Sequence, residues 1–209
     1  MDRYLFAFGL AASIAAATVA GYAARVAQTE SPPPILASGG FESGLSSPWG
    51  TCLYPEFHPQ AKSIWFNHGK CRSWAEADRE TRFSGKTSLH VVNPGPLAPG
   101  DYGMTTQTIK VVPNQRYRVL LWARAKNLAS DKAVWVHYEA GRACSLPLVR
   151  LDKGTYDWTP FTGTFVCNEP QADFCIVSAG TGEVWIDDIV IEPEPGVVAA
   201  KPSAPRGRP

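Results

Sequence analysis

The stretch Trp185-Ile186-Asp187-Asp188-Ile189-Val190-Ile191, near the end of the chain, places aromatic and β-branched residues around two carboxylates. A second stretch near the start, Gly39-Gly40-Phe41-Glu42-Ser43-Gly44, also sets a carboxylate beside an aromatic ring. Aromatic and β-branched residues favour strands, and glycines favour turns. The two stretches therefore predict the first and last strands of one β-sandwich.

Short β-prone runs separated by turn residues fill the chain between the two stretches. We expect strands at residues 87–92, 104–112, 116–125, 133–139, 148–151, 159–167, 174–178 and 183–192. Their lengths and spacing favour an all-β fold made of two antiparallel sheets.

The composition is that of one neutral domain rich in turns. The chain has 209 residues, which is enough for one domain with a full core. The net charge of +1 creates no field that would attract nucleic acid or acidic lipid. Gly and Pro number 18 each beside seven Trp, which favours short strands over long helices.

The five cysteines form no C-x-x-C motif, which argues against a zinc ribbon or a thioredoxin-type site. If the N-terminal segment described below exports the domain from the cytoplasm, the five cysteines predict up to two disulfides and one remaining thiol. Cys52–Cys71 is the favoured bridge because both residues flank one loop, and the second bridge would join two of Cys144, Cys167 and Cys175. The alternative is five buried, reduced cysteines.

Residues 4–24 carry no charge, and as a helix they would span about 31 Å, close to the thickness of a bilayer's hydrocarbon core. Gly9, Ser13, Ala17 and Gly21 recur every four residues, a spacing that lets membrane helices approach closely. We expect residues 1–27 to be a retained transmembrane anchor, with a cleaved signal peptide as the alternative. Either reading places the domain outside the cytoplasm, in the periplasm or at the cell surface, and the anchor would hold it in the inner membrane.

The rest of the chain divides by composition. Residues 28–35 form a Pro-rich spacer, residues 36–193 the sandwich, and residues 194–209 a flexible Pro-rich tail. The longest irregular stretch, residues 43–80, contains three tryptophans. A loop region of this length is usually functional or held by a bridge.

Several short motifs occur in a familiar order: Gly40-Phe41-Glu42, Ser84-Gly85, Thr106-Gln107, Trp122-Ala123-Arg124-Ala125 and Trp185-Ile186-Asp187-Asp188-Ile189. This order resembles the carbohydrate-binding modules of the family 4, 9 and 22 types, which have a galactose-binding-like jelly-roll fold. The resemblance implies a jelly roll over nearly the whole domain. It also implies a structural Ca²⁺ that joins the first strand to the last, with Glu42 and Asp187 as carboxylate ligands. Calcium prefers about six to eight oxygen ligands, so the two acids suit it. The alternative is that both are ordinary acids paired with Lys or Arg.

A sugar site needs flat aromatic rings beside polar groups. Alternation places Tyr117, Val119, Leu121 and Ala123 in the core and turns Trp122 and Arg124 away from it. On the following strand, Trp135, His137 and Glu139 also point away. We predict that these five outward residues line a glycan-binding face. The alternative is that the two tryptophans complete the core while the charged residues lie at its rim.

The loop tryptophans Trp49, Trp65 and Trp74 are further candidate contacts, for sugar or for protein.

Enzyme motifs are absent from the sequence. It contains no G-x-S-x-G, H-E-x-x-H, Walker or dinucleotide-binding pattern. The four histidines show no metal-ligand spacing. We therefore expect a protein that is not an enzyme.

Two functions remain. In the first, the chain is an accessory subunit of a larger membrane complex, for example a respiratory or photosynthetic one, held through its helix and its Trp-rich loops. In the second, it is a secreted or anchored module that stacks glycan on exposed tryptophans. The helix and the proline spacer favour the first function, and the family resemblance favours the second.

Overall fold

The structure, a computed structural model, describes residues 33–53, 63–140, 143–144 and 147–198. Within these ranges no helix combines the length and the apolar character that a membrane crossing requires. The predicted anchor, residues 1–27, lies outside the described residues. The membrane anchor, the location outside the cytoplasm and the role in a membrane complex therefore stay predictions.

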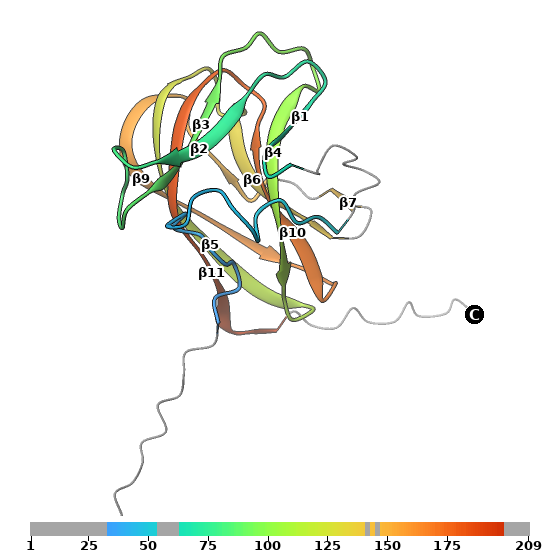
Figure 1. The fold of residues 1–209 in the computed structure, drawn as a ribbon. Helices are drawn as coiled ribbons and strands as arrows, with labels where there is room; N and C mark the ends of the chain where they lie inside the picture. The colour runs from blue at the N-terminus through green and yellow to red at the C-terminus, as the bar shows by residue number, and fades with distance from the viewer. Residues whose placement is uncertain (1–32, 54–62, 141–142, 145–146, 199–209) are drawn as a thin grey trace, which may run out of the picture. The chain divides into compact units, whose positions relative to one another are not determined.

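The described residues form two antiparallel sheets packed face to face (Figure 1). Sheet A has the order β1-β4-β10-β6-β7, with β8 pairing with β6, and sheet B has the order β2-β3-β11-β5-β9. The strands of sheet A are β1 (Phe66–His68), β4 (Tyr102–Lys110), β6 (Val134–Ala140), β7 (Ala143–Cys144), β8 (Val149–Arg150) and β10 (Gln171–Ser178). Those of sheet B are β2 (Trp74–Asp78), β3 (Ser88–Asn93), β5 (Gln115–Leu128), β9 (Gly154–Val166) and β11 (Gly182–Val198). The predicted all-β, two-sheet antiparallel sandwich is confirmed.

The core lies between the sheets and follows the alternation of the strands. In β5, Tyr117, Val119, Leu121 and Ala123 are buried, as predicted. Phe174 and Ile176 of β10 meet them from the other sheet. Since side chains alternate across a strand, every second residue of β5 faces this core and its neighbours face outward.

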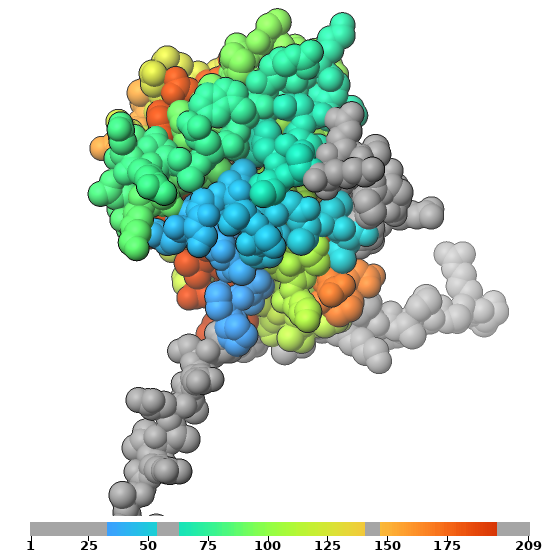
Figure 2. Space-filling view, viewed as in Figure 1, coloured from blue at the N-terminus to red at the C-terminus, as the bar shows by residue number. Residues whose placement is uncertain are grey.

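The predicted first strand, at Gly40–Glu42, is wrong. Residues 37–40 form turns, and the positive φ angles of Ser38 (56°) and Phe41 (53°) prevent an extended chain. The segment nevertheless lies against the last strand, because Ile189 donates its N–H to the carbonyl of Gly39 at 3.1 Å. Figure 2 shows the segment in blue, on the surface next to the green residues of the β2–β3 connection.

The last stretch does form a strand, and it carries a bulge. The register of β11 against β5 shifts between Asp187 and Val190, and Asp188 has a φ of 46°, which Asp tolerates better than most residues. The strand continues to Val198, past residue 193 where the sequence predicts the sandwich to end and the tail to begin. Residues 199–209 lie outside the described residues.

Candidate functional site

The outer face of sheet B carries a row of aromatic rings. His90 of β3 stacks on Trp185 of β11 with ring centroids 4.3 Å apart and planes at 3°. Trp74 of β2 meets His90 edge-on at 5.5 Å, and the guanidinium of Arg124 on β5 lies 5.7 Å from the Trp185 ring. These groups come from four neighbouring strands, because the strand register places outward residues side by side.

A second group of rings extends the row toward β9. Phe83, in the β2–β3 connection, stacks on Trp122 of β5 at 4.0 Å and tilts against Trp158 of β9 at 5.8 Å. The side chains of Trp74 and Phe83 are 43% and 38% exposed. We call this surface the aromatic face; its rings are Trp74, Phe83, His90, Trp122, Trp158 and Trp185.

Polar groups lie between the rings of the aromatic face. Lys126 Nζ donates to Glu183 Oε1 at 2.9 Å, and this hydrogen bond, more than the partial burial of the carboxyl, sets the lowered pKa of Glu183. The indole of Trp185 donates to Asp78 Oδ2 at 2.7 Å. Burial raises the pKa of Asp78, but hydrogen bonds from the Thr81 backbone and from Trp185 outweigh it and leave the pKa below its usual value. The face therefore keeps ionised carboxylates beside its rings.

The structure separates the five residues predicted to line one site. Trp122 and Arg124 belong to the aromatic face of sheet B, whereas Trp135, His137 and Glu139 lie on β6 of sheet A. The two groups therefore lie on opposite outer surfaces of the sandwich. Although β5 and β6 follow each other in the chain, they belong to different sheets.

The loop tryptophans have three different environments. Trp49 is buried and stacks on Phe41 at 5.5 Å, so it belongs to the core and is no surface contact. Trp65 is partly buried and donates to Ser73 Oγ at 3.2 Å. Trp74 starts β2 and is exposed.

Sequence reasoning missed Phe83, His90, Trp158 and Trp185 as members of the aromatic face. The outward alternation of Glu183, Trp185 and Asp187 would have been a usable signal for Trp185.

The outer face of sheet A is partly covered by the segment Gly50–Leu53. Gly50 donates its N–H to Thr106 O at 2.7 Å, and Thr108 donates its N–H to Thr51 Oγ1 at 2.8 Å. Leu53 donates its N–H to the buried carboxylate of Asp173 at 2.7 Å. These bonds carry the segment across β4 to Asp173 of β10. The other outward residues of β10, Cys175 and Val177, are buried with Phe66 and Met104.

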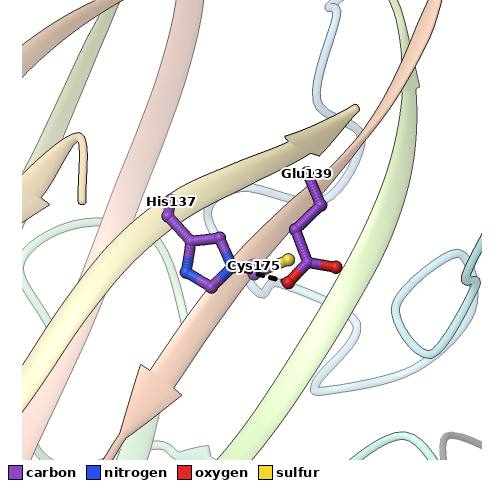
Figure 3. Close-up of side chains that lie close together, drawn as sticks. All are labelled: His137, Glu139 and Cys175. Carbon is purple, nitrogen blue, oxygen red and sulfur yellow. Dashed lines mark hydrogen bonds and ion pairs between the residues drawn. The ribbon is translucent and has the colours of Figure 1, made fainter. Parts of the chain in front are cut away.

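Three chemically reactive side chains converge beneath the outer surface of sheet A (Figure 3). His137, Glu139 and Cys175 are buried, and their nitrogen, oxygen and sulfur atoms lie within 4.8 Å of one another. His137 Nε2 is 3.0 Å from Glu139 Oε1, and Trp135 Nε1 donates to His137 Nδ1 at 3.1 Å.

The hydrogen bond from Trp135 decides what this cluster can bind. Because Nδ1 of His137 accepts a hydrogen, the hydrogen of the neutral ring is on Nε2 and points to Glu139. A metal at Nε2 would move this hydrogen to Nδ1, where it would meet the N–H of Trp135. The cluster therefore fits a hydrogen-bonded chain from Trp135 through His137 to Glu139 and does not fit a metal site centred on Nε2.

The predicted calcium ligands both hold the β2–β3 connection. Asp187 is fully buried; its Oδ2 accepts N–H groups from Phe83 and Ser84 at 3.0 and 3.1 Å. Both oxygens of Glu42 accept the N–H of Lys86, at 3.0 and 2.9 Å. Burial raises the pKa of Asp187 despite these bonds. The two side chains thus join the start of the domain, the β2–β3 connection and the last strand.

The donor set around Glu42 and Asp187 suits calcium in its chemistry. Beside Glu42 and Asp187, the Asp188 carboxylate, which accepts a hydrogen from Ser84 Oγ at 3.0 Å, offers further oxygen atoms of the kind that calcium binds. The N–H groups already directed at the carboxylates stabilise them without a cation. Calcium at Glu42 and Asp187 stays a prediction.

The predicted Cys52–Cys71 disulfide is wrong. Cys71 keeps its thiol, which is buried and donates to Ser73 Oγ at 3.3 Å. Cys52 lies elsewhere, where it hydrogen bonds to the side chain of Asp173. Cys167 and Cys175 also donate thiol hydrogens, to the carbonyls of Glu169 and Asp173. The side chain of Cys144 lies outside the described residues.

No protein-family model matches the chain, and no curated protein matches its sequence. Solved structures do match its fold. A family 4 carbohydrate-binding module superposes with a TM-score of 0.50 at 14% identity, and the match covers 75% of this chain and 98% of that one. The chain has the jelly-roll fold of carbohydrate-binding modules.

A second match is the enzymatically active domain of tailspike protein 4 from bacteriophage CBA120. It superposes with a TM-score of 0.53 at 14% identity over 77% of this chain. The chain spans only 21% of that tailspike domain. At such identities the two matches show the fold alone.

Proposed function

We propose that this domain is a non-catalytic glycan-binding module and that the aromatic face of sheet B is its binding surface. The observation that carries the proposal is the exposure of Trp74 and Phe83 on a face with four further rings. Sugar rings have apolar C–H faces that pack on aromatic side chains, and their hydroxyls need hydrogen-bonding partners.

The aromatic face supplies both kinds of contact. Trp74 and Phe83 present apolar surface, while exposed Glu76 and Arg124 provide an acceptor and a donor between them. Arg124 Nε is 3.8 Å from Asp157 Oδ1, a distance that leaves the guanidinium loosely held and able to bond a hydroxyl. The outer face of sheet A offers less, because Thr106 and Asp173 bond to the segment Gly50–Leu53 and because His137 and Glu139 are buried.

The rings of the aromatic face also fix one another. Trp122 is stacked by Phe83, and Trp185 is held by His90, Arg124 and its bond to Asp78. A surface with few free rotamers loses little conformational entropy when a ligand binds. The fixed positions of these rings make a preformed surface, which favours the binding of an extended polysaccharide.

Affinity electrophoresis of the full chain in mild detergent, through gels that contain neutral polysaccharides such as xylan and mixed-linkage β-glucan, tests the proposal. We expect at least one gel to retard the chain. Trp74→Ala should weaken that binding about tenfold, which corresponds to about 1.4 kcal/mol. Phe83→Ala should act in the same direction because Trp122 loses the ring that stacks on it.

Trp135→Ala is the matched control, since it removes a tryptophan from the outer face of sheet A. Thermal melting of each variant separates loss of binding from loss of fold. Equal retardation of Trp74→Ala and the parent chain would place the binding surface elsewhere, and failure of every polysaccharide would contradict the function.

A further inference from the structure

A pocket of about 340 Å³ lies where the chain enters β2 and where it leaves β3. The residues that line it are Lys70, Arg72, Gly95, Pro96, Leu97, Ala98 and Asp101. They come from the β1–β2 and β3–β4 connections, which lie side by side at the top of Figures 1 and 2. The volume is at the lower end of the range for small-molecule sites.

The two cations of the pocket keep hydrogen-bonding capacity that the described residues do not use. Within the described part of the chain, neither Lys70 nor Arg72 has an acidic side chain within ion-pair distance. The guanidinium of Arg72 donates to the neighbouring carbonyl of Cys71 at 3.1 Å, which leaves its other N–H groups available. Both side chains are exposed.

The one acid that lines the pocket is directed at the backbone. Asp101 Oδ2 accepts the N–H of Ala98 at 3.1 Å, and the carboxylate also accepts the backbone N–H of Lys70. A Cβ on Gly69 would lie 1.9 Å from Asp101 Oδ1, so the carboxylate is pressed against this turn. The bond from Ala98 lowers the pKa of Asp101 and keeps it charged, so the lining has a net charge of one positive unit (two cations and one anion).

Part of the pocket lining is apolar. Pro96, Leu97 and Ala98 form it, after a cis peptide bond between Gly95 and Pro96. A pyranose ring that carries a carboxylate has one apolar face and one charged edge. The apolar wall and the Arg72 fork match these two features, since guanidinium binds carboxylate through paired hydrogen bonds.

The pocket continues the aromatic face. Arg72 precedes exposed Trp74 by two residues, and the buried residues Cys71 and Ser73 alternate with them. This alternation turns Arg72 and Trp74 to the same side of the chain. A polysaccharide lying on Trp74 would therefore bring its next unit to the pocket.

We infer that the pocket at Lys70 and Arg72 is a subsite for a uronic acid unit, so that the module prefers acidic polysaccharides. The inference rests on the proposed function, because the aromatic face would hold the neighbouring sugar units of the polysaccharide. The carboxylate of the uronate pairs with Arg72 and Lys70, and its ring packs on Leu97.

Binding of the full chain to polygalacturonate and to a neutral β-glucan, measured by affinity electrophoresis, tests the subsite. The double variant Lys70→Ala/Arg72→Ala should lose about tenfold in affinity for polygalacturonate and keep its affinity for the neutral glycan. The control Arg79→Ala removes an exposed cation beyond the far end of β2 and should change neither. Added salt should weaken the binding of polygalacturonate and leave the binding of the neutral glucan unchanged.

Monomeric galacturonate and galactose, titrated against the chain by NMR, separate the two proposals. Shifts at Arg72 and Leu97 with galacturonate alone support the subsite. If Trp74→Ala then binds polygalacturonate as tightly as the parent chain, the subsite stands while the aromatic face is not the binding surface, which contradicts the proposed function. Absence of these shifts, or equal losses for Arg79→Ala and the double variant, overturns the subsite.

Discussion

The two outer faces of the sandwich differ, although the same alternation of side chains produces both. On sheet A, the segment Gly50–Leu53 covers outward residues such as Thr106 and Asp173, and their polar atoms bond within the protein. On sheet B, Trp74 and Phe83 stay exposed beside charged groups. An outward position on a strand therefore stays accessible only where no other part of the chain covers it.

Removal of the acid that holds the covering segment should have the largest effect on this difference. Asp173 accepts hydrogens from Leu53 N, at 2.7 Å, and from Thr108 Oγ1, at 2.7 Å. Asp173→Ala leaves these two partly buried donors without their acceptor, at a cost of about 1–3 kcal/mol each. We expect the free energy of unfolding, from urea titration, to fall by about 3 kcal/mol. Faster hydrogen exchange at Leu53 should accompany it.

Asp173→Asn is the control for Asp173→Ala. An amide keeps an acceptor oxygen, and burial raises the pKa of Asp173, so loss of the charge removes a desolvation penalty. This variant should be clearly more stable than the alanine variant. Equal stability of the two would show that the covering segment is not held by Asp173.

Calcium removal would have the next largest effect, if Glu42 and Asp187 bind the ion as predicted. A site filled at about a hundred times its dissociation constant stabilises the fold by about 2.7 kcal/mol. A chelator should then lower the melting midpoint by several degrees. The β2–β3 connection carries Phe83, so the same treatment should weaken glycan binding at the aromatic face. An unchanged midpoint contradicts the calcium prediction.

The sequence predicts the layers of this fold well because alternation is a local property. The inward residues of β5 could be read from their spacing, and all of them are buried. Two-residue periodicity does not say which strands pair, however. Alternation alone therefore predicted that Trp122 and Trp135 share one face. In the structure the chain crosses from sheet B to sheet A between these two residues, so they lie on different faces.

Irregular segments are harder to predict, because they have no period that reveals burial. Trp49 and Trp74 both lie in residues 43–80, which the sequence predicts to be irregular, yet Trp49 packs in the core and Trp74 is exposed at the start of β2. The Asp187 carboxylate accepts the N–H of Phe83 and helps to hold its loop against the aromatic face, a contact between residues 104 positions apart. No local pattern contains such information.

The smallest predicted effect compares Asp78 on sheet B with Asp173 on sheet A, whose pKa values shift in opposite directions. The pKa of Asp78 is lowered in the folded state, so its contribution is present above about pH 3.8, its usual value, and is lost as the pH falls through the folded pKa. Burial raises the pKa of Asp173. The contribution of Asp173 to the free energy of unfolding is therefore fully present below about pH 3.8 and is lost as the pH rises through the folded pKa. Because Asp78 is partly exposed, its effect should stay below about 1 kcal/mol.

Urea midpoints between pH 2.5 and 7 measure the difference. Below pH 3.8, the usual pKa of Asp, Asp78→Asn should lose less stability than the parent chain does. The fluorescence of Trp185 should also change less on acidification, because its indole no longer bonds to a group that titrates. Asp173→Asn should instead gain on the parent chain as the pH rises above that value. If both variants follow the parent chain over the whole range, the two faces do not differ in the way their carboxylates are held.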